Sequence, residues 1–157
     1  MIMNLSTFFR TSLACDPTDD VPLSDEIRMQ RLYLDIEQVR FPERLSTAFD
    51  VPEELAKVRV PSMILQPVVE NAIKHGVARS TDPVTISVSA RRANGSLTLA
   101  VEDNAHGNGR PAERGEGVGL NNVCDRLAAR YNGSAACTYG PKPEGGFKVE
   151  LRMPLQQ

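Results

Sequence analysis

The sequence predicts an α/β fold. We expect a two-layer α/β sandwich in which a mixed sheet of about five strands carries helices on one face, preceded by two N-terminal helices. Apolar residues recur at three- and four-residue spacing through the first forty positions, which is typical of amphipathic helices. Between positions 85 and 101 polar and apolar residues alternate instead, as they do in strands. Further helical segments are interspersed with the alternating ones.

The first forty residues are expected to form two helices. The first covers residues 2–14, with apolar positions at Ile2, Leu5, Phe8, Phe9 and Leu13. In the second, Ser24 is the expected N-cap, and Asp25 and Glu26 follow in the first turn, where carboxylates interact favourably with the helix dipole. This helix runs to about Val39, and its apolar stripe comprises Met29, Leu32, Tyr33, Ile36 and Val39 or Arg40.

The middle of the chain begins with a strand and continues with a third helix. Residues 44–50 alternate as a strand does, and Pro61 is well placed as the first residue of a helix over residues 62–75. Gly76 would cap the end of that helix. The alternating segments 85–91 and 96–101 flank Asn94-Gly95, a strong signal for a two-residue hairpin.

The C-terminal part of the chain completes the sheet. Residues 104–118 form a loop rich in glycine and charge, and a fourth helix runs from Leu120 to about Tyr131, closed by Asn132-Gly133. Residues 135–139 and 147–153 then predict a final pair of strands.

Composition restricts the class of protein. The 157 residues are 41% apolar and 24% charged with a net charge of −2, which is ordinary for one compact domain. No basic run is present, so nucleic acid is not expected as a partner. No apolar run reaches the roughly 18 residues of a membrane span. The widely spaced Cys15, Cys124 and Cys137 are expected to be reduced, buried or half-buried thiols of a cytosolic protein.

Polar residues share one stripe of the third helix. At 3.6 residues per turn, Asn71, Lys74 and His75 lie on the same side as Pro67, opposite the apolar face. The Asn71 amide oxygen suits Mg²⁺, which prefers oxygen ligands. Lys74 can balance phosphate charge, and His75 offers a flat ring or a hydrogen bond.

A strand end and a glycine-rich loop add the remaining parts of a nucleotide site. Asp103 can accept a hydrogen bond from the exocyclic amine of adenine, and Gly107 permits close approach of the backbone to a planar ring. Backbone N–H groups near a helix N-terminus form an anion site. The candidates for it are Gly115, Gly117, Val118, Gly119 and Leu120. Together these features predict an ATP site that is not of the P-loop kind.

The order of these segments resembles the Bergerat-type (GHKL) ATP site of sensor histidine kinases, the DNA gyrase B subunit, MutL and Hsp90. Asn71 with Lys74 matches the asparagine box, Asp103 with Gly107 the first glycine box, and residues 115–119 the second. The finer resemblance is to LytS-type sensor histidine kinases. It rests on the following residues: Pro61, Gln66-Pro67, Glu70-Asn71-Ala72, His75-Gly76, Gly119-Leu120, Asn122 and Arg126-Leu127, together with Leu5-Ser6, Phe9-Arg10, Leu13, Glu26, Tyr33, Glu37 and Arg40-Phe41 upstream.

The chain departs from that pattern in two places. Ala105 replaces the first glycine of the family's Asp-x-Gly-x-Gly, and Phe147 replaces a threonine that usually follows Gly-Gly. In ATP-hydrolysing relatives a glutamate lies one helical turn before the asparagine, and here that position is Pro67. Glu70 is expected to point about 100° away from Asn71. The site therefore favours phosphoryl transfer to a protein nucleophile over hydrolysis.

The resemblance implies a division into a helical linker, residues 1–40, and an ATP-binding catalytic domain, residues 41–157. It implies ATP and Mg²⁺ as cofactors, Asn71 as the metal ligand, and Asn71 with Lys74 as the catalytic residues. The chain is then expected to be a fragment whose acceptor histidine lies upstream.

The parent protein implied by this resemblance is a homodimer that passes the phosphoryl group to a response regulator. It is expected to be membrane-anchored, with this part in the cytoplasm. The alternatives are a nucleotide-binding pseudokinase or scaffold, an ATPase of the same superfamily, and a serine kinase that acts on an anti-anti-sigma partner.

Overall fold

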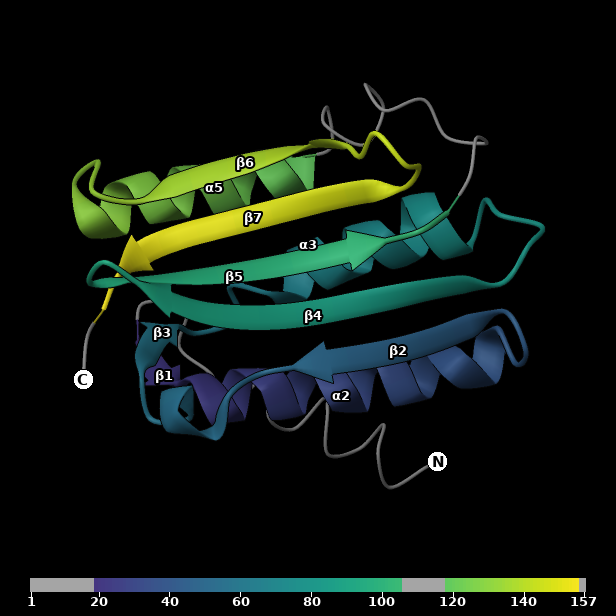
Figure 1. Cartoon of the computed structure of the whole chain (residues 1–157), viewed down its shortest axis with the longest axis horizontal. Coiled ribbons are helices and arrows are strands. Elements are labelled where there is room, and N and C mark those ends of the chain that lie inside the picture. The colour runs from purple at the N-terminus through teal and green to yellow at the C-terminus, as the bar shows by residue number, and fades with distance from the viewer. Residues whose placement is uncertain (1–18, 106–117, 156–157) are drawn as a thin grey trace.

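The computed structural model describes residues 19–105 and 118–155, which contain a five-stranded sheet. In spatial order its strands are β2 (Leu45–Asp50), β4 (Val84–Ala93), β5 (Ser96–Asp103), β7 (Phe147–Pro154) and β6 (Ala136–Pro141). β2 is parallel to β4, and the other neighbouring pairs are antiparallel. The helices α2 (Leu23–Arg40), α3 (Gln66–Asn71) and α5 (Val118–Tyr131) cover one face of the sheet (Figure 1). The predicted fold class is confirmed, and the helix predicted over residues 2–14 lies outside the described residues.

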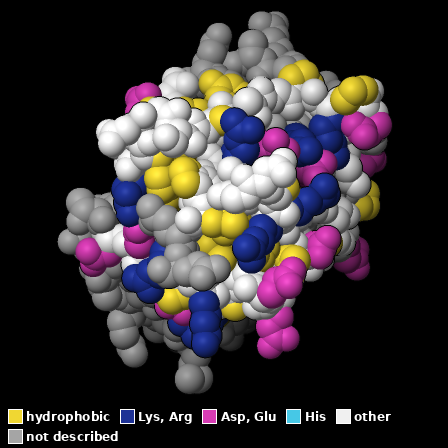
Figure 2. Space-filling model, turned by 60° about the vertical axis from the view of Figure 1, so that its left-hand side comes forward, with side chains coloured by type: hydrophobic (Ala, Val, Ile, Leu, Met, Phe, Trp, Pro, Cys, Tyr) yellow, Lys and Arg dark blue, Asp and Glu magenta, His cyan; other side chains and the backbone are white. Residues whose placement is uncertain are grey.

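The core lies between this sheet and the helices, because every second strand residue points toward them. The apolar strand residues buried there include Val84, Ile86, Val88, Leu97, Leu99, Val101, Val149, Leu151 and Met153. Leu23, Ile27 and Leu34 of α2 belong to the same buried cluster. On the face drawn in Figure 2, acidic and basic side chains are interspersed and hydrophobic side chains form small separate groups. None of the helices in the described ranges is long and apolar enough to cross a bilayer.

Two turn predictions are confirmed. Asn94 and Gly95 have φ angles of 51° and 75°, so both adopt the left-handed conformation that a tight hairpin between β4 and β5 needs. At the end of α5, Asn132 and Gly133 have φ angles of 50° and 83°, and the Gly133 N–H donates to the Ala128 carbonyl at 3.2 Å. The chain therefore reverses after α5 where the sequence predicts it.

The predicted N-cap of α2 is wrong. The helix begins at Leu23, its N-cap position is Pro22, and no side chain caps it. The N–H groups of Leu23 and Ser24 donate instead to the carbonyls of Val58 and Ala56, at 2.8 and 3.0 Å. Because a distant segment satisfies these first-turn donors, the Ser24 hydroxyl is not needed for that purpose.

The predicted apolar stripe of α2 is wrong as well. Val39 is 57% exposed, and of the predicted stripe only Met29 is fully buried. The buried face consists of Leu23, Glu26, Ile27, Met29, Gln30, Leu34 and Glu37. Three of these are polar, so apolar periodicity alone could not locate the packed face of this helix.

The prediction that Pro61 starts the third helix is also wrong. Pro61 ends β3 (Arg59–Pro61), which pairs antiparallel with β1 (Asp20–Pro22) in a two-stranded ribbon absent from the sequence prediction. A short 3₁₀ helix, η1 (Glu53–Leu55), precedes β3. Gly76 is buried inside the π-helical turn η2 (Ala72–Val77), so it does not cap the helix. Arg44 stabilises the end instead, since its guanidinium donates to the carbonyls of Val77, at 2.7 Å, and Ser80.

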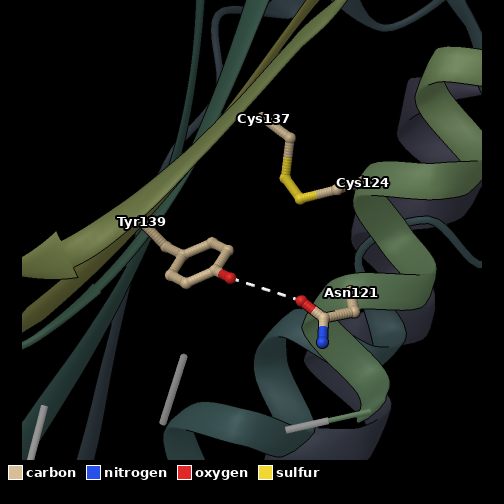
Figure 3. The surroundings of a disulfide bond; sticks show 4 residues. All are labelled: Asn121, Cys124, Cys137 and Tyr139. Carbon is tan, nitrogen blue, oxygen red and sulfur yellow. Dashed lines mark hydrogen bonds between the residues drawn. A yellow bond between two sulfur atoms is a disulfide. The ribbon is translucent and has the colours of Figure 1, made fainter. Parts of the chain in front are cut away.

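A disulfide corrects the expectation of reduced cysteines. Cys124 of α5 and Cys137 of β6 are bonded, with their Cα atoms 5.4 Å apart (Figure 3). A second contact joins the same two elements. The Tyr139 hydroxyl of β6 donates to the amide oxygen of Asn121, which lies one turn before Cys124 in α5, at 3.3 Å. The two cysteines meet because α5 packs beside the edge strand, a tertiary contact that their separation of 13 residues does not reveal. Cys15 lies outside the described residues.

We expect that breaking this disulfide destabilises the fold. Closing a loop of about this length contributes about 3 kcal/mol, or roughly 6–12 °C in Tm for a chain of this size. Thermal unfolding with and without dithiothreitol would measure the difference, and the Cys124→Ser variant should unfold at the same temperature in both conditions. Peptide mapping under non-reducing conditions that finds Cys124 and Cys137 as separate thiols would contradict the prediction.

Candidate functional site

A cavity of about 300 Å³ lies between α3, η2 and the start of α5. Its lining residues are Pro67, Glu70, Asn71, Lys74, His75, Gly119 and Leu120. The first five come from one continuous helical segment and the last two from a segment more than forty positions later. The structure therefore brings the predicted stripe of the third helix together with the predicted second glycine segment. The volume is at the lower end of the range for small-molecule sites.

A change of helix type accompanies the polar stripe. Ordinary α-helix ends at Asn71, and η2 continues as a π-helix in which the Ala78 N–H donates to the Ile73 carbonyl at 2.8 Å. A π-turn widens the helix, and such turns are frequent at functional sites. Lys74 and His75 lie within this wider turn and still line the cavity with Asn71. Lys74 is exposed, whereas Asn71 and His75 are half-buried.

The start of α5 closes the opposite side of the cavity. Gly119 is exposed and packs near Pro67, since a Cβ placed at Gly119 would be 3.8 Å from the Pro67 Cβ. Leu120 is only 1% exposed and joins the core. Val118 is the first residue of α5, and its side chain is not described. Gly107, Gly115 and Gly117 lie outside the described residues, so their predicted roles stay predictions.

Asp103 is placed differently from the other candidates. It is the last residue of β5, as predicted, and is only 2% exposed. Its Oδ1 accepts a hydrogen bond from the Ala105 N–H at 3.1 Å. Within the described part of the chain, Asp103 is not among the residues that line the cavity. The neighbouring Asn104 accepts a hydrogen bond from the Thr85 N–H at 2.8 Å, which ties this strand end to β4.

Sequence reasoning missed the close contact between Gly146 and the backbone of Asp103. A Cβ at Gly146 would be 2.0 Å from the Asp103 carbonyl oxygen, and Gly146 has a φ of 95°. Both conditions require glycine. The next residue, Phe147, pairs with Asp103 in the sheet, is 3% exposed, and stacks on Tyr139 with ring centroids 6.3 Å apart. The Gly145-Gly146 pair directly before a strand is the signal that could have revealed this contact.

Glu70 is expected to point about 100° away from Asn71, and the structure places it on the lining of the same cavity. Glu70 lines the cavity beside Asn71, although the two are neighbours in the helix. Both residues can line the cavity because it spans more of the helix surface than the stripe of Asn71, Lys74 and His75. Glu70 is exposed, and its Oε1 accepts a hydrogen bond from the Gln66 side-chain amide at 3.1 Å. The cavity therefore contains a carboxylate as well as an amide, an ammonium and an imidazole.

The comparison with protein families decides the family of the chain. Residues 57–157 match the family described as histidine kinase-, DNA gyrase B- and HSP90-like ATPase, and residues 1–45 match the histidine kinase family. The chain belongs to this ATPase family. Membership of the ATPase family implies that the chain has an ATP site, and it confirms the Bergerat-type resemblance.

Among curated proteins, sensor histidine kinases of this ATPase family are similar over almost the whole chain. The sensor histidine kinase BtsS of Escherichia coli (strain K12) is 39% identical over 154 residues, which cover 98% of this chain and 27% of that protein. The sensor protein LytS of Enterococcus faecalis is 33% identical over 171 residues, covering 100% of this chain and 28% of that protein. The LytS-type resemblance is thereby confirmed. The chain spans about a quarter of the length of these relatives.

Solved structures support the same fold. The histidine kinase domain from a blue-light activated histidine kinase of Erythrobacter litoralis gives a TM-score of 0.63 at 19% identity, covering 90% of this chain and 65% of that one. A catalytic domain of the histidine kinase ThkA gives 0.62 at 14% identity, covering 87% and 96%. At these identities the likeness shows the fold alone.

We expect Gly146→Ala to displace the end of β5. The added Cβ must move the Asp103 carbonyl and force a left-handed alanine, at a cost of about 1–3 kcal/mol for the backbone strain alone. Chemical denaturation would measure the loss. Gly95→Ala is a matched control, since its φ is 75° but nothing lies within 4 Å of the added Cβ. A loss no larger in Gly146→Ala than in Gly95→Ala would contradict the close contact with Asp103.

Proposed function

We propose that this chain is the ATP-binding catalytic part of a two-component sensor histidine kinase. It would transfer the γ-phosphoryl group of ATP to a histidine upstream of this chain, for relay to a response regulator. The observation that carries this proposal is the cavity that Asn71, Lys74 and His75 share with Gly119 and Leu120. Asn71 and Lys74 belong to the asparagine box and Gly119 to the second glycine box, and all of these residues line one cavity.

In this proposal the residues divide by the part of the nucleotide they contact. Asn71 holds the metal, and Lys74 balances the charge of the phosphates. His75, Gly119 and Leu120 form the wall of the pocket, and Asp103 with Gly107 recognises adenine. Gly115, Gly117 and Val118 cover the phosphates with their N–H groups. Catalysis then depends on positioning and on charge stabilisation of the γ-phosphoryl group, with Asn71 and Lys74 as the catalytic residues.

The donor set in the cavity fits Mg²⁺ brought in by a nucleotide. No group of three or more His, Cys, Asp or Glu side chains that could hold a metal occurs among the residues the structure describes. A protein cage is not required, because Mg²⁺ usually keeps several waters and takes phosphate oxygens with one or two protein oxygens. The Asn71 amide, with the Glu70 carboxylate on the same lining, can supply them. The ion would neutralise charge between the β- and γ-phosphates.

Transfer to a protein is favoured over hydrolysis by Pro67. Its ring lines the cavity one turn before Asn71, where it can neither accept a proton nor orient a water molecule. The Glu70 carboxylate lies on the same lining but accepts a hydrogen bond from Gln66. We therefore propose that bound ATP is not hydrolysed and reacts only when an acceptor side chain enters the site.

The parent protein extends the proposal beyond this chain. We propose residues 1–40 as the helical linker and residues 41–157 as the catalytic domain. The parent would be a homodimer whose own upstream dimerisation helix carries the acceptor histidine. It would be anchored in a membrane with this part on the cytoplasmic side, as is typical of sensor kinases.

We expect Asn71→Ala to lower phosphotransfer by about 100-fold, the effect of removing one stabilising group from a transfer site. Asn71→Asp should also weaken it, because a carboxylate alters the geometry around the metal. The measurement is transfer from Mg·ATP to a separately supplied acceptor-helix fragment of a LytS-type kinase. Calorimetric titration with metal-free ATP is the control, since its affinity should change far less. If Asn71→Ala lowered the affinity for ATP equally with and without Mg²⁺, the role of Asn71 as a metal ligand would be contradicted.

We expect Asp103→Asn to lower the preference for ATP over GTP by about tenfold, the value of one hydrogen bond of this kind. The amide oxygen can still accept from Ala105, so the local fold is retained, but its NH₂ opposes the exocyclic amine of adenine. Calorimetry with Mg·ATP and Mg·GTP would measure both affinities. Glu102→Gln is the matched control, because that carboxylate belongs to the preceding residue on the strand and pairs with Lys142. Equal ATP and GTP binding by the unmodified chain would contradict the role of Asp103.

A further inference from the structure

A carboxylate of α2 holds the segment that leads into α3. Glu26 is 2% exposed, its Oε1 accepts a hydrogen bond from the Met63 N–H at 2.9 Å, and its Oε2 accepts one from the Leu65 N–H at 2.8 Å. Leu65 is the N-cap residue of α3, and the side chain at this position makes no capping hydrogen bond to the helix. Both oxygens of one buried side chain are therefore used on N–H groups directly before the cavity helix. A negative charge there also interacts favourably with the helix dipole.

Arg126 of α5 contacts the same segment as Glu26. The Arg126 guanidinium donates to the Ser62 carbonyl at 2.8 Å, within the segment that Glu26 holds. Burial raises the pKa of Glu26 above its ordinary value, while the two backbone hydrogen bonds and the charge of Arg126 act in the opposite direction. A buried carboxylate is retained at low cost only where such partners are in place. Residues 62–65 are thus contacted by α2 and α5 together.

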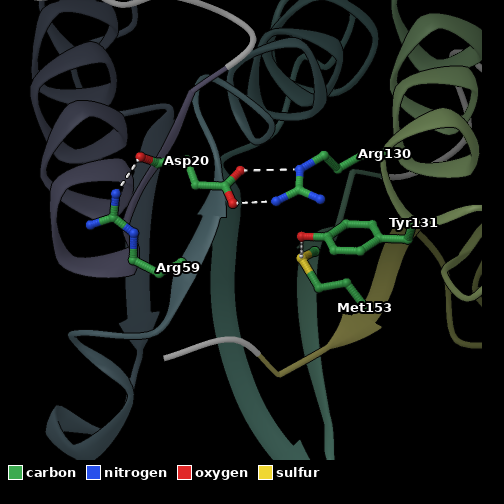
Figure 4. A network of polar contacts seen from close by, with 5 residues as sticks. All are labelled: Asp20, Arg59, Arg130, Tyr131 and Met153. Carbon is green, nitrogen blue, oxygen red and sulfur yellow. Dashed lines mark hydrogen bonds and ion pairs between the residues drawn. The ribbon is translucent and has the colours of Figure 1, made fainter.

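The segment before α2 is connected to α5 in the same region. The Arg130 guanidinium donates to the Asp20 carboxylate at 2.5 Å, and Arg59 donates to the Asp20 carbonyl at 2.7 Å (Figure 4). The Ser62 N–H donates to the carbonyl of Asp19 at 2.9 Å. The ribbon of β1 and β3 thereby links the start of α2 to both helices that line the cavity.

We propose that Glu26 is a positioning residue for the nucleotide site, which fixes the start of α3 to α2 and so sets where Asn71 and Lys74 lie. The inference rests on the proposed function, because it assigns to that same site a residue outside it. Among the described residues, Glu26 is not one of those that line the cavity. A displacement of the linker helix α2 would move the start of α3 through these two hydrogen bonds.

Two substitutions of Glu26 test its hydrogen bonds: Glu26→Gln removes the charge and one acceptor together, whereas Glu26→Asp keeps the charge and both acceptors. Glutamine has one acceptor oxygen, so in Glu26→Gln one of the two N–H groups faces an NH₂ group and loses its partner. Aspartate keeps both oxygens on a side chain shorter by one methylene, so Glu26→Asp should weaken the two hydrogen bonds less than Glu26→Gln does. Asp25→Asn is the matched control. It removes a carboxylate from the neighbouring position, where Asp25 pairs only with exposed Arg28 at 3.4 Å among the contacts described.

Amide hydrogen exchange and calorimetry on the whole chain provide the readouts. In Glu26→Gln we expect exchange across residues 63–77 to rise by about tenfold, the loss of one buried hydrogen bond, with no change in the β4–β5 hairpin. We expect the Kd for Mg·ATP to rise by a similar factor at a temperature well below the unfolding transition. Glu26→Asp should give intermediate values, and Asp25→Asn should match the unmodified chain.

Other outcomes would overturn the inference. A uniform rise in exchange across α3 and the hairpin, with an unchanged Kd, would mean that Glu26 contributes to global stability alone. Unchanged exchange at Met63 and Leu65 would mean that it does not hold α3. If the unmodified chain bound no Mg·ATP at all, the proposed function would fail, and a local rise in exchange would still show that Glu26 fixes α3.

Discussion

The candidate site depends on the packing of α3 and α5 against one apolar face of the sheet. Val68, Val69, Ala72 and Ile73 on the first helical segment and Leu120, Val123 and Leu127 on the second belong to the same buried cluster. Because these apolar stripes face the strands, the polar residues of the first segment are directed away from the core. The distance between the helices is small where Pro67 meets Gly119. A cavity that Asn71, Lys74 and His75 help to line forms there as a consequence of burying the opposite stripes.

Much of this arrangement could be predicted from the sequence, because it follows from local patterns. Strict alternation located β4 and β5, and Asn94-Gly95 located the hairpin between them. Helical periodicity placed Asn71, Lys74 and His75 on one stripe, and all three line the same cavity. The chain therefore folds these segments largely as their own residues dictate.

The features that could not be predicted depend on contacts between distant segments. Ser24 is not a cap because carbonyls of residues 56 and 58 take over the first-turn N–H groups of α2. Pro61 is in a strand because it pairs with Asp20. Cys124 and Cys137 are bonded because α5 lies beside β6. In each case the local sequence predicted one structure, and a contact with a distant segment produced another. Glu70 is a different case, since helix geometry gives its direction relative to Asn71 but does not show which residues line the cavity.

The π-turn η2 determines the spacing that the chain uses around Asn71. A π-turn accommodates one residue more than an α-helical turn does, so it is equivalent to a single-residue insertion within a regular helix. The turn is held at its end by the carbonyl contacts of Arg44 from outside the helix. If this segment were superimposed on an uninterrupted α-helix of a relative, the residues after Asn71 would therefore be out of register by one position. Equivalent side chains there have to be matched by their place in space and not by counting positions.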